Sequence, residues 1–136
     1  MILTNTGPLI ALLDADDRHH QRCVDGIKKL PAAPMLTTWP CFTEAIYLLG
    51  ATGGYSYQEK LWQLYETKRL VLHTPSILEV ESMHKLMETY QDTPMDLADA
   101  SLVAAAEALG VRQILTLDTH FYVYRLAGGD VLEVVI

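Results

Sequence analysis

The chain has 136 residues, 50% of them hydrophobic and 20% charged, which suits one globular domain with a core of its own. Its formal net charge of −7 argues against a protein that holds nucleic acid by overall positive charge. An acidic site that recruits a cation stays compatible with nucleic-acid chemistry. Two cysteines give no disulfide framework, and we find no targeting signal and no apolar run of the ~18 residues that a membrane span needs. We therefore expect a reduced, cytoplasmic protein with no membrane association.

Apolar runs and turn residues predict strands that alternate with helices along residues 1–136. The first half of the chain predicts a strand at 2–5, a helix from Thr6 to near Asp14, a helix at 18–30 capped by Asp16 or Asp17, a strand at 35–38, a helix at 40–49 that stops at Gly50, a helix opened by a capping box at 56–59 and reaching about Thr67, and a strand at 70–73. The second half predicts a helix capped by Thr74 and Pro75 and ending near Tyr90, a loop at 91–95, a helix at 97–109 capped by Asp96 and ended by Gly110, and strands at 113–117 and 131–135. This alternation indicates an α/β domain whose mostly parallel sheet is covered on both faces.

Glu44, Asp99 and Asp118 each interrupt an apolar stretch. Residues 30–59, around Glu44, contain no Lys or Arg, and neither do residues 86–111, around Asp99. An unpaired carboxylate near a core is costly, and a bound cation offsets both its desolvation and the repulsion between acids. The five histidines lack the spacing of a zinc site, whereas hard oxygen ligands favour Mg²⁺ or Mn²⁺. The pattern therefore predicts a carboxylate metal site.

The expected fold brings some of these residues together. Sites in open parallel sheets form beyond the carboxyl ends of the strands, at a switch in strand order. Asn5 ends the first predicted strand and Asp118 ends the fourth, so these positions could meet there. Glu44 and Asp99 would then reach the site from flanking helices.

Four segments carry a resemblance to a known family. In chain order they are ILTNTGPLIALLD, TWPCFTEAIYLL, DTPMDLADASLVAAAEALG and ILTLDTHFYVYR. Together they resemble the small, single-domain form of the PIN domain, similar to VapC-type toxin ribonucleases of bacterial toxin–antitoxin pairs. The resemblance implies a three-layer α/β/α fold with a mostly parallel five-stranded sheet and a metal-dependent endoribonuclease that leaves a 5′-phosphate and a 3′-hydroxyl. It also implies an RNA substrate, an antitoxin partner and a homodimer. Matched motif by motif, the site residues are Asn5, Glu44, Asp99 and Asp118.

The chain departs from the family pattern at position 5, where the family has Asp and this chain has Asn5. An amide oxygen can bind a cation but brings no charge, so Mg²⁺ affinity and water activation should both weaken. Two explanations fit the sequence equally well. The change could disarm a toxin so that it can be expressed, or it could belong to a natural protein with altered activity.

Each of the three acids also has a simpler explanation. Glu44 could reach solvent from a helix edge. Asp99 could be the third residue of a capped helix, where negative charge is favoured. Asp118 could open a turn. We favour the ligand role for all three.

Further residues are candidates for supporting roles. The hydroxyls of Thr6 and Thr116 could orient a metal-bound water or a substrate phosphate, although a helix cap and a strand residue explain them as well. Asp96 could support the metal ligands, although its role as a helix cap suffices. Arg125 could contact an RNA phosphate, because a guanidinium matches phosphate with two hydrogen bonds.

Two functions from different classes remain. The first is the metal-dependent endoribonuclease, the toxin of a toxin–antitoxin pair, weakened by Asn5. The second is a catalytically silent PIN-like module that binds RNA or a protein partner. A phosphatase with a nucleophilic Asp at the first strand end is disfavoured because Asn5 stands there, and no phosphate-binding glycine motif is present.

Overall fold

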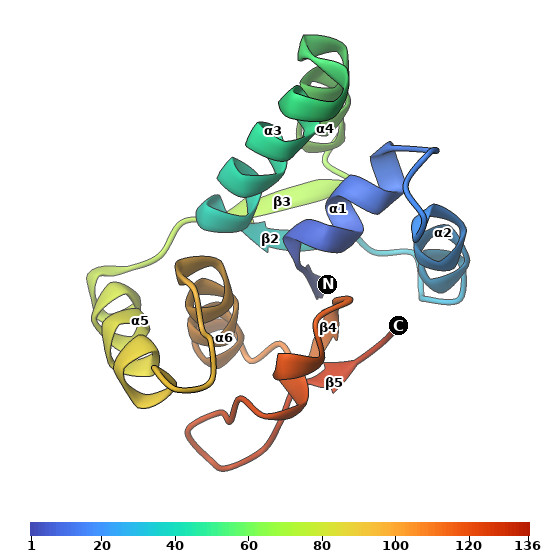
Figure 1. The fold of residues 1–136 in the computed structure, drawn as a ribbon. Coiled ribbons are helices and arrows are strands. Elements are labelled where there is room, and N and C mark those ends of the chain that lie inside the picture. The colour runs from blue at the N-terminus through green and yellow to red at the C-terminus, as the bar shows by residue number, and fades with distance from the viewer.

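The computed structural model describes residues 1–136 as a single parallel sheet with helices on both faces (Figure 1). The five strands are β1 (Ile2–Thr4), β2 (Met35–Thr38), β3 (Leu70–His73), β4 (Gln113–Leu115) and β5 (Glu133–Val134). They lie in the order β3-β2-β1-β4-β5, and every neighbouring pair is parallel. The expected α/β class and five-stranded sheet are confirmed.

Six α-helices and one short 3₁₀ helix connect the strands. They are α1 (Thr6–Leu13), α2 (His20–Lys28), α3 (Trp39–Gly53), α4 (Tyr55–Glu66), α5 (Ile77–Thr89), α6 (Leu97–Leu109) and η1 (Thr119–Tyr122). In Figure 1, α3 and α4 form one pair of neighbouring helices and α5 and α6 form another. No helix is both long and apolar enough to cross a membrane.

The two faces of the sheet contribute to two separate hydrophobic cores. Leu36 and Val71 pack in the larger core with α5 and α6, whereas Met35 and Leu70 pack in the smaller core with α1, α3 and α4. Neighbouring residues of a strand point to opposite faces, so a strand covered on both faces is mostly apolar. The buried hydroxyls of Thr37 and Thr38 in β2 are satisfied by hydrogen bonds to Thr4 O and to the Ser101 hydroxyl.

The sequence misplaced the boundaries of two helices. We expected α2 to begin at residue 18 with an Asp16 or Asp17 cap, but it begins at His20. Asp17 instead accepts a hydrogen bond from His19 N (2.8 Å), which closes a turn before the helix. We expected α3 to stop at Gly50, but it continues to Gly53. The missing side chain of Gly50 leaves room for the amide of Gln58 on α4, so this glycine serves helix packing rather than helix termination.

Two helix caps also differ from the expectation. Ser56 does not cap α4, because its hydroxyl donates to Gly53 O (3.1 Å) and the helix starts at Tyr55. α5 is capped by Ser76, not by Thr74 and Pro75, and Ser76 and Glu79 form a reciprocal capping box.

In the last part of the chain, the strands β4 and β5 are shorter than expected. The sequence thus identified every strand and α-helix but not η1, and it placed several termini a few residues away.

Gly54 separates α3 from α4 in a backbone conformation, φ 67° and ψ −160°, that residues with a Cβ rarely adopt. We expect Gly54→Ala to lower the free energy of unfolding by roughly 1–3 kcal/mol because of this strain. Gly128→Ala is the matched control, because a Cβ there meets no atom within 4 Å and its φ is not in the left-handed region. Urea unfolding of both variants measures the difference. Equal stabilities would contradict the strained conformation at Gly54.

Candidate active site at the carboxyl ends of the strands

The predicted meeting point of the first and fourth strands exists. β1 and β4 are neighbours at the switch in strand order, and Asn5 N donates to Leu115 O (3.0 Å) just beyond them. The side chain of Asn5 donates through Nδ2 to Thr116 Oγ1 (3.1 Å), which also accepts Asp118 N (3.0 Å). The fully buried Thr116 therefore links the two strand ends and turns the chain out of β4 toward Asp118.

Asn5 is also the N-cap of α1. Its Oδ1 accepts Thr6 N (2.8 Å) and lies 3.8 Å from Cys41 Sγ, which donates to it. An amide turned the other way would set its NH₂ group against the N–H of Thr6, so the oxygen faces the helix and the NH₂ faces Thr116. Asn5 therefore offers the site hydrogen-bond donors. Its predicted role as a metal ligand would require its oxygen to release Thr6 N or the weaker donor Cys41 Sγ.

Thr6 is not the helix cap that its position in the sequence allowed. Asn5, not Thr6, caps α1. The buried hydroxyl of Thr6 donates to Cys41 O (3.4 Å), which ties α1 to α3. In this arrangement the hydroxyl of Thr6 supports the packing of two helices beside the site.

Asp99 is the most confined of the three predicted acidic ligands, with 7% of its surface exposed. It forms a capping box with Asp96, in which Asp99 N donates to Asp96 Oδ1 (2.8 Å) and Asp96 N donates to Asp99 Oδ2 (3.2 Å). Asp96 is exposed, and helix capping accounts for it. The other oxygen of Asp99, Oδ1, accepts no hydrogen bond and still has accessible surface, because no fully buried side-chain oxygen lacks a partner. One oxygen of Asp99 is thus free to bind a ligand.

The folded chain disfavours the negative charge of the Asp99 carboxylate. The pKa of Asp99 is raised to about 7, chiefly by burial and also by the negative charges of Asp96 and Asp118, against the lowering effect of its hydrogen bond from Asp96 N. This influence of Asp118 also places the two predicted ligands in the same electrostatic neighbourhood. A cation bound between them would relieve both the desolvation and the repulsion.

Asp118 begins the 3₁₀ helix η1, as the turn interpretation allowed. Its Oδ1 accepts His120 N (2.9 Å) and lies 2.9 Å from His120 Nδ1. Its side chain is 31% exposed, and its Oδ2 takes part in no hydrogen bond within the chain. Asp118 therefore combines a turn-forming oxygen with a free one.

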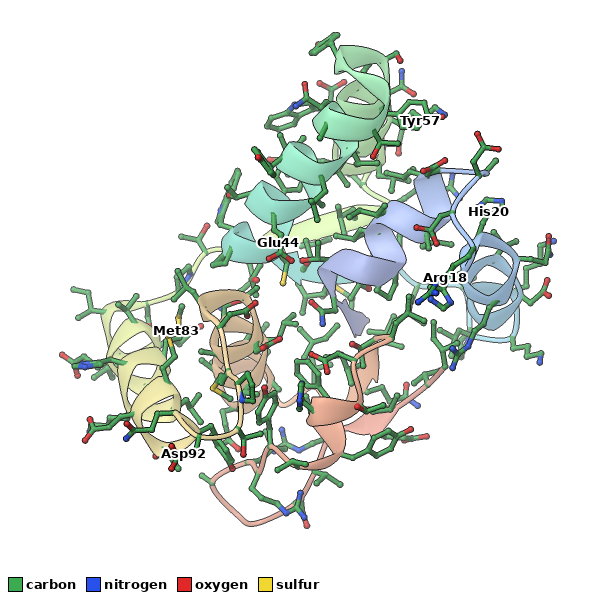
Figure 2. All side chains as sticks on the ribbon, in the orientation of Figure 1. Arg18, His20, Glu44, Tyr57, Met83 and Asp92 are labelled. Carbon is green, nitrogen blue, oxygen red and sulfur yellow. The ribbon has the colours of Figure 1, made fainter.

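Glu44 differs from the expectation of a costly buried acid, because its side chain is exposed. It makes no hydrogen bond and no ion pair, and Figure 2 shows it on the side of α3 turned toward the middle of the molecule. Cys41, one helical turn earlier, is buried against Asn5 and against Ala98 O of α6 (3.9 Å). That contact places the Glu44 turn of α3 beside the rest of the site. The cost of burial was thus the wrong argument for Glu44, although its position suits a ligand.

These acids do not form a ready-made metal cage. No three His, Cys, Asp or Glu side chains of residues 1–136 converge as a formed metal site does. A carboxylate at position 5 would have been one more acid at this point, and Asn5 removes it. The donor chemistry still suits Mg²⁺, which often binds through only one or two carboxylates and keeps several waters.

Sequence reasoning missed Tyr124, which lies in the larger core with its hydroxyl at the site. The hydroxyl donates to Pro94 O and lies 3.4 Å from Asp99 Oδ2, so it holds the loop before α6 and the carboxylate together. Burial and the charges of Asp99 and Asp118 raise the pKa of Tyr124, so it stays a donor. The spacing of Phe121 and Tyr124 could have indicated a shared helical face, but not this contact.

Arg125, the predicted RNA contact, is exposed and folds back on its own turn. Its Nη1 donates to Tyr122 O (3.0 Å) and Val123 O (2.9 Å). The other guanidinium nitrogens remain free. A phosphate contact by Arg125 stays a prediction.

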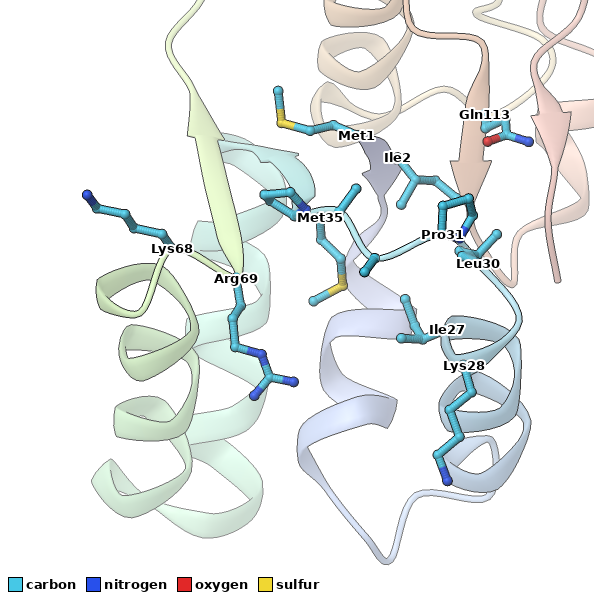
Figure 3. Close-up of a pocket in the computed structure, with 13 residues that line it drawn as sticks. Met1, Ile2, Ile27, Lys28, Leu30, Pro31, Met35, Lys68, Arg69 and Gln113 are labelled. Carbon is cyan, nitrogen blue, oxygen red and sulfur yellow. The ribbon is translucent and has the colours of Figure 1, made fainter.

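A hollow of about 620 Å³ lies at the opposite edge of the sheet (Figure 3). Residues at the starts of the strands line it, including Ile2, Met35 and Gln113, and none of its lining residues is acidic. Figure 3 shows Lys68 pointing away from this hollow. It is therefore separate from the acids and has no part in their chemistry.

Known proteins resemble this chain over nearly its whole length. No family model matches the chain. Ribonuclease VapC26 of Mycobacterium tuberculosis is 27% identical over 139 residues, which cover 98% of this chain and 99% of that protein. The crystal structure of VapC20 of M. tuberculosis, described as a Sarcin-Ricin loop cleaving toxin, superimposes with a TM-score of 0.82 at 16% identity, over 90% of this chain and 94% of that one. The chain has the PIN-domain fold and is similar to VapC toxins.

Two complexes show the same PIN-domain fold. VapBC2 from Rickettsia felis, bound to a DNA fragment from their promoter, gives a TM-score of 0.64 at 12% identity, over 90% of this chain and 92% of that one. FitAcB from Neisseria gonorrhoeae gives 0.60 at 16% identity, over 88% of each chain. The resemblance to the PIN domain is thus confirmed over nearly the whole chain.

Proposed function

We propose that this chain is a metal-dependent endoribonuclease, the toxin of a toxin–antitoxin pair, with its activity weakened by Asn5. One observation carries the proposal. Asp99 and Asp118 lie at the carboxyl edge of a PIN sheet, each with one oxygen free of hydrogen bonds, and the charge on Asp99 is unfavourable without a cation. The similarity to ribonuclease VapC26 supports RNA as the substrate.

The proposed metal is Mg²⁺ or Mn²⁺. Asp99 Oδ1, Asp118 Oδ2 and the carboxylate of Glu44 would hold it. Asn5 would join them only if its amide oxygen released Thr6 N or Cys41 Sγ. A bound cation lowers the pKa of a coordinated water and offsets the charge that develops on phosphorus during hydrolysis. One or two ions suit this donor set.

The other residues of the chain position these groups. Thr116 keeps position 5 and Asp118 in register through its two accepted hydrogen bonds. Tyr124 fixes Asp99 against the loop before α6. The buried Cys41 packs α3 against Asn5, and burial raises the pKa of its thiol, so it stays protonated as a donor and is not itself a ligand.

The proposed partners are RNA, an antitoxin protein and a second copy of the chain. Exposed apolar side chains on the first turns of α5 and α6, Ile77, Leu78, Val80 and Leu97, offer surface for protein contacts. The toxin similarity further suggests a cytoplasmic protein.

Cleavage of a mixed pool of single-stranded and structured RNA, with Mg²⁺, Mn²⁺ or EDTA, tests the proposed function. We expect slow cleavage that needs the cation, leaves 5′-phosphate ends and disappears in Asp118→Asn. Cleavage that persists in EDTA or in Asp118→Asn would contradict a carboxylate metal site.

A second function is favoured by one observation, the NH₂ group that Asn5 presents toward Thr116 where a carboxylate oxygen would face the site. Such a chain could be a catalytically silent PIN module that binds RNA or a protein partner. RNA binding without cleavage, by this chain and by Asn5→Asp alike, would select it.

We expect Asp118→Asn to abolish the rise in melting temperature that Mg²⁺ causes, because the variant loses a charged ligand. In EDTA the change should be small, since relief of repulsion toward Asp99 offsets the lost pairing with His120. Asp130→Asn, an exposed residue, is the control for the change in net charge. A melting temperature that responds to Mg²⁺ equally in both variants would leave Asp118 as a turn residue only.

A further inference from the structure

A small hollow of about 70 Å³ adjoins the acid site and connects it to α2. Thr116 and Asp118 line it from the site, Thr119 and Tyr122 from η1, and Arg22 from α2. Sequence reasoning selected neither Arg22 nor Tyr122, because their approach depends on how α2 packs beside the strand ends. The hollow therefore adds residues to the surroundings of the acids.

Arg22 supplies a free positive charge in this hollow. The two ion pairs of the chain are His73–Glu79 and His120–Asp118, so no carboxylate lies within 4.0 Å of the Arg22 guanidinium. The side chain is exposed and makes no hydrogen bond within the chain. A guanidinium held beside a carboxylate site, yet unpaired, is suited to an anionic ligand that arrives from outside.

Thr119 and Tyr122 supply the two other features of the hollow. The exposed Thr119 hydroxyl has no partner within the chain. The Tyr122 side chain is 57% exposed, and its ring stacks on no other ring of the protein. A cation, a hydroxyl and an accessible aromatic ring are the groups by which proteins hold the phosphate, the sugar and the base of single-stranded RNA.

The hollow is small. At about 70 Å³ it is well below the ~300–1,000 Å³ of sites that enclose a drug-sized ligand, so it suits a phosphate group while the rest of a nucleotide stays outside. The base would then lie outside, against the Tyr122 ring. We propose that this hollow binds the phosphate of an RNA nucleotide next to the cleaved bond, with Arg22 as its cation and Tyr122 as the stacking surface for the base. This inference rests on the proposed nuclease function.

Fluorescence anisotropy of a short labelled single-stranded RNA, titrated with the full chain over a range of salt concentrations, tests the inference. The titrations are run with Mg²⁺ and with EDTA, and RNA integrity is checked on a gel. We expect Arg22→Ala to weaken binding about tenfold and to reduce the slope of log affinity against log salt by about 1. Arg22→Lys should restore the slope but only part of the affinity, because an ammonium lacks the forked geometry.

The variant Tyr122→Leu distinguishes RNA from free phosphate as the ligand of this hollow. It should weaken RNA binding roughly 5- to 100-fold without changing the salt slope, because stacking involves no counterion. Binding that depends on Arg22 but not on Tyr122 would overturn the nucleotide site and leave a phosphate site alone. Both side chains are exposed, so the variants should fold, and their melting temperatures verify this.

Arg69→Ala is the matched control, an exposed arginine at the opposite edge of the sheet (Figure 3). Equal losses in Arg22→Ala and Arg69→Ala would mean general electrostatics and would overturn the inference. If the parent chain binds no RNA at all, the proposed function fails as well. A polyglutamate peptide whose binding is lost in Arg22→Ala would then assign the hollow to an acidic protein segment.

Discussion

Asn5→Asp should raise the rate of Mg²⁺-dependent RNA cleavage roughly 10- to 100-fold, the range by which single groups around a metal site commonly change affinity or activity. The new carboxylate keeps one oxygen on Thr6 N as the cap of α1 and turns the other toward Thr116. It thereby adds a charged ligand beside Asp99 and Asp118. Initial rates on one defined RNA, measured over a Mg²⁺ titration, give both the activity and the apparent metal affinity.

The surroundings of position 5 can accept this change. The Thr116 hydroxyl now accepts from Asn5 Nδ2 and Asp118 N, and it can instead donate to a carboxylate while still accepting Asp118 N. The cost is electrostatic, because a further acid joins a site whose charges already repel. We therefore expect Asn5→Asp to melt at a lower temperature in EDTA and to gain more from Mg²⁺ than the parent does.

The matched control combines Asn5→Asp with Asp118→Asn, which keeps the formal net charge of the parent. If charge at the strand ends were all that mattered, this double variant would behave like the parent. If each acid is needed, the double variant should cleave less RNA than the parent, as expected for Asp118→Asn alone. The carboxylate-site model would be abandoned if Asn5→Asp improved neither cleavage nor Mg²⁺ affinity.

Asp99→Asn should make the metal-free protein more stable at pH 8, by on the order of 2 kcal/mol, and little different at pH 4. The folded chain raises the pKa of Asp99 to about 7, from the ordinary value of 3.8, chiefly by burial. The folded state therefore holds this proton more tightly than the unfolded state does. The resulting stability is fully present below about pH 4, declines as pH rises toward 7 and is lost above it.

Urea unfolding in EDTA at several pH values between 4 and 8 measures this effect. The parent should lose stability across the range, and Asp99→Asn should lack that loss while its amide oxygen can still accept Asp96 N. Asp92→Asn is the control, because Asp92 is an exposed loop residue at the periphery of the molecule (Figure 2). Parallel pH profiles for all three proteins would show that Asp99 is not an unfavourably charged group. Mg²⁺ should stabilise the parent above pH 7 and leave Asp99→Asn nearly unchanged.

Several elements were predictable because their signals are local. β2 and β3 have the expected bounds, and α6 runs from Leu97 to Leu109 between its Asp96 cap and Gly110. Each is an apolar segment bounded by a residue with a strong preference for a cap or a turn. The helix starts failed where several polar residues compete, as at Asp16 and Asp17, since any of them can accept from a free backbone N–H.

The candidate site was only partly predictable. Sequence alone determined which acids lack a nearby base and that Asn5 and Asp118 follow strands. It could not determine that Glu44 is exposed or that the amide of Asn5 turns its oxygen to Thr6 N. Such properties depend on the groups that surround a side chain, and many of those groups are distant in the chain.

The amino-acid sequence by itself determined the alternation of strands and helices, the parallel sheet that follows from it, and the acids at its carboxyl edge. The tertiary structure alone decided the strand order, the confinement of Asp99 by Tyr124, and the approach of Arg22 and Tyr122 to the site. The physical reason is the distance along the chain over which each effect acts. Backbone preferences act within a few residues, whereas burial, hydrogen bonding and electrostatic fields are set by residues that only the packed fold brings together.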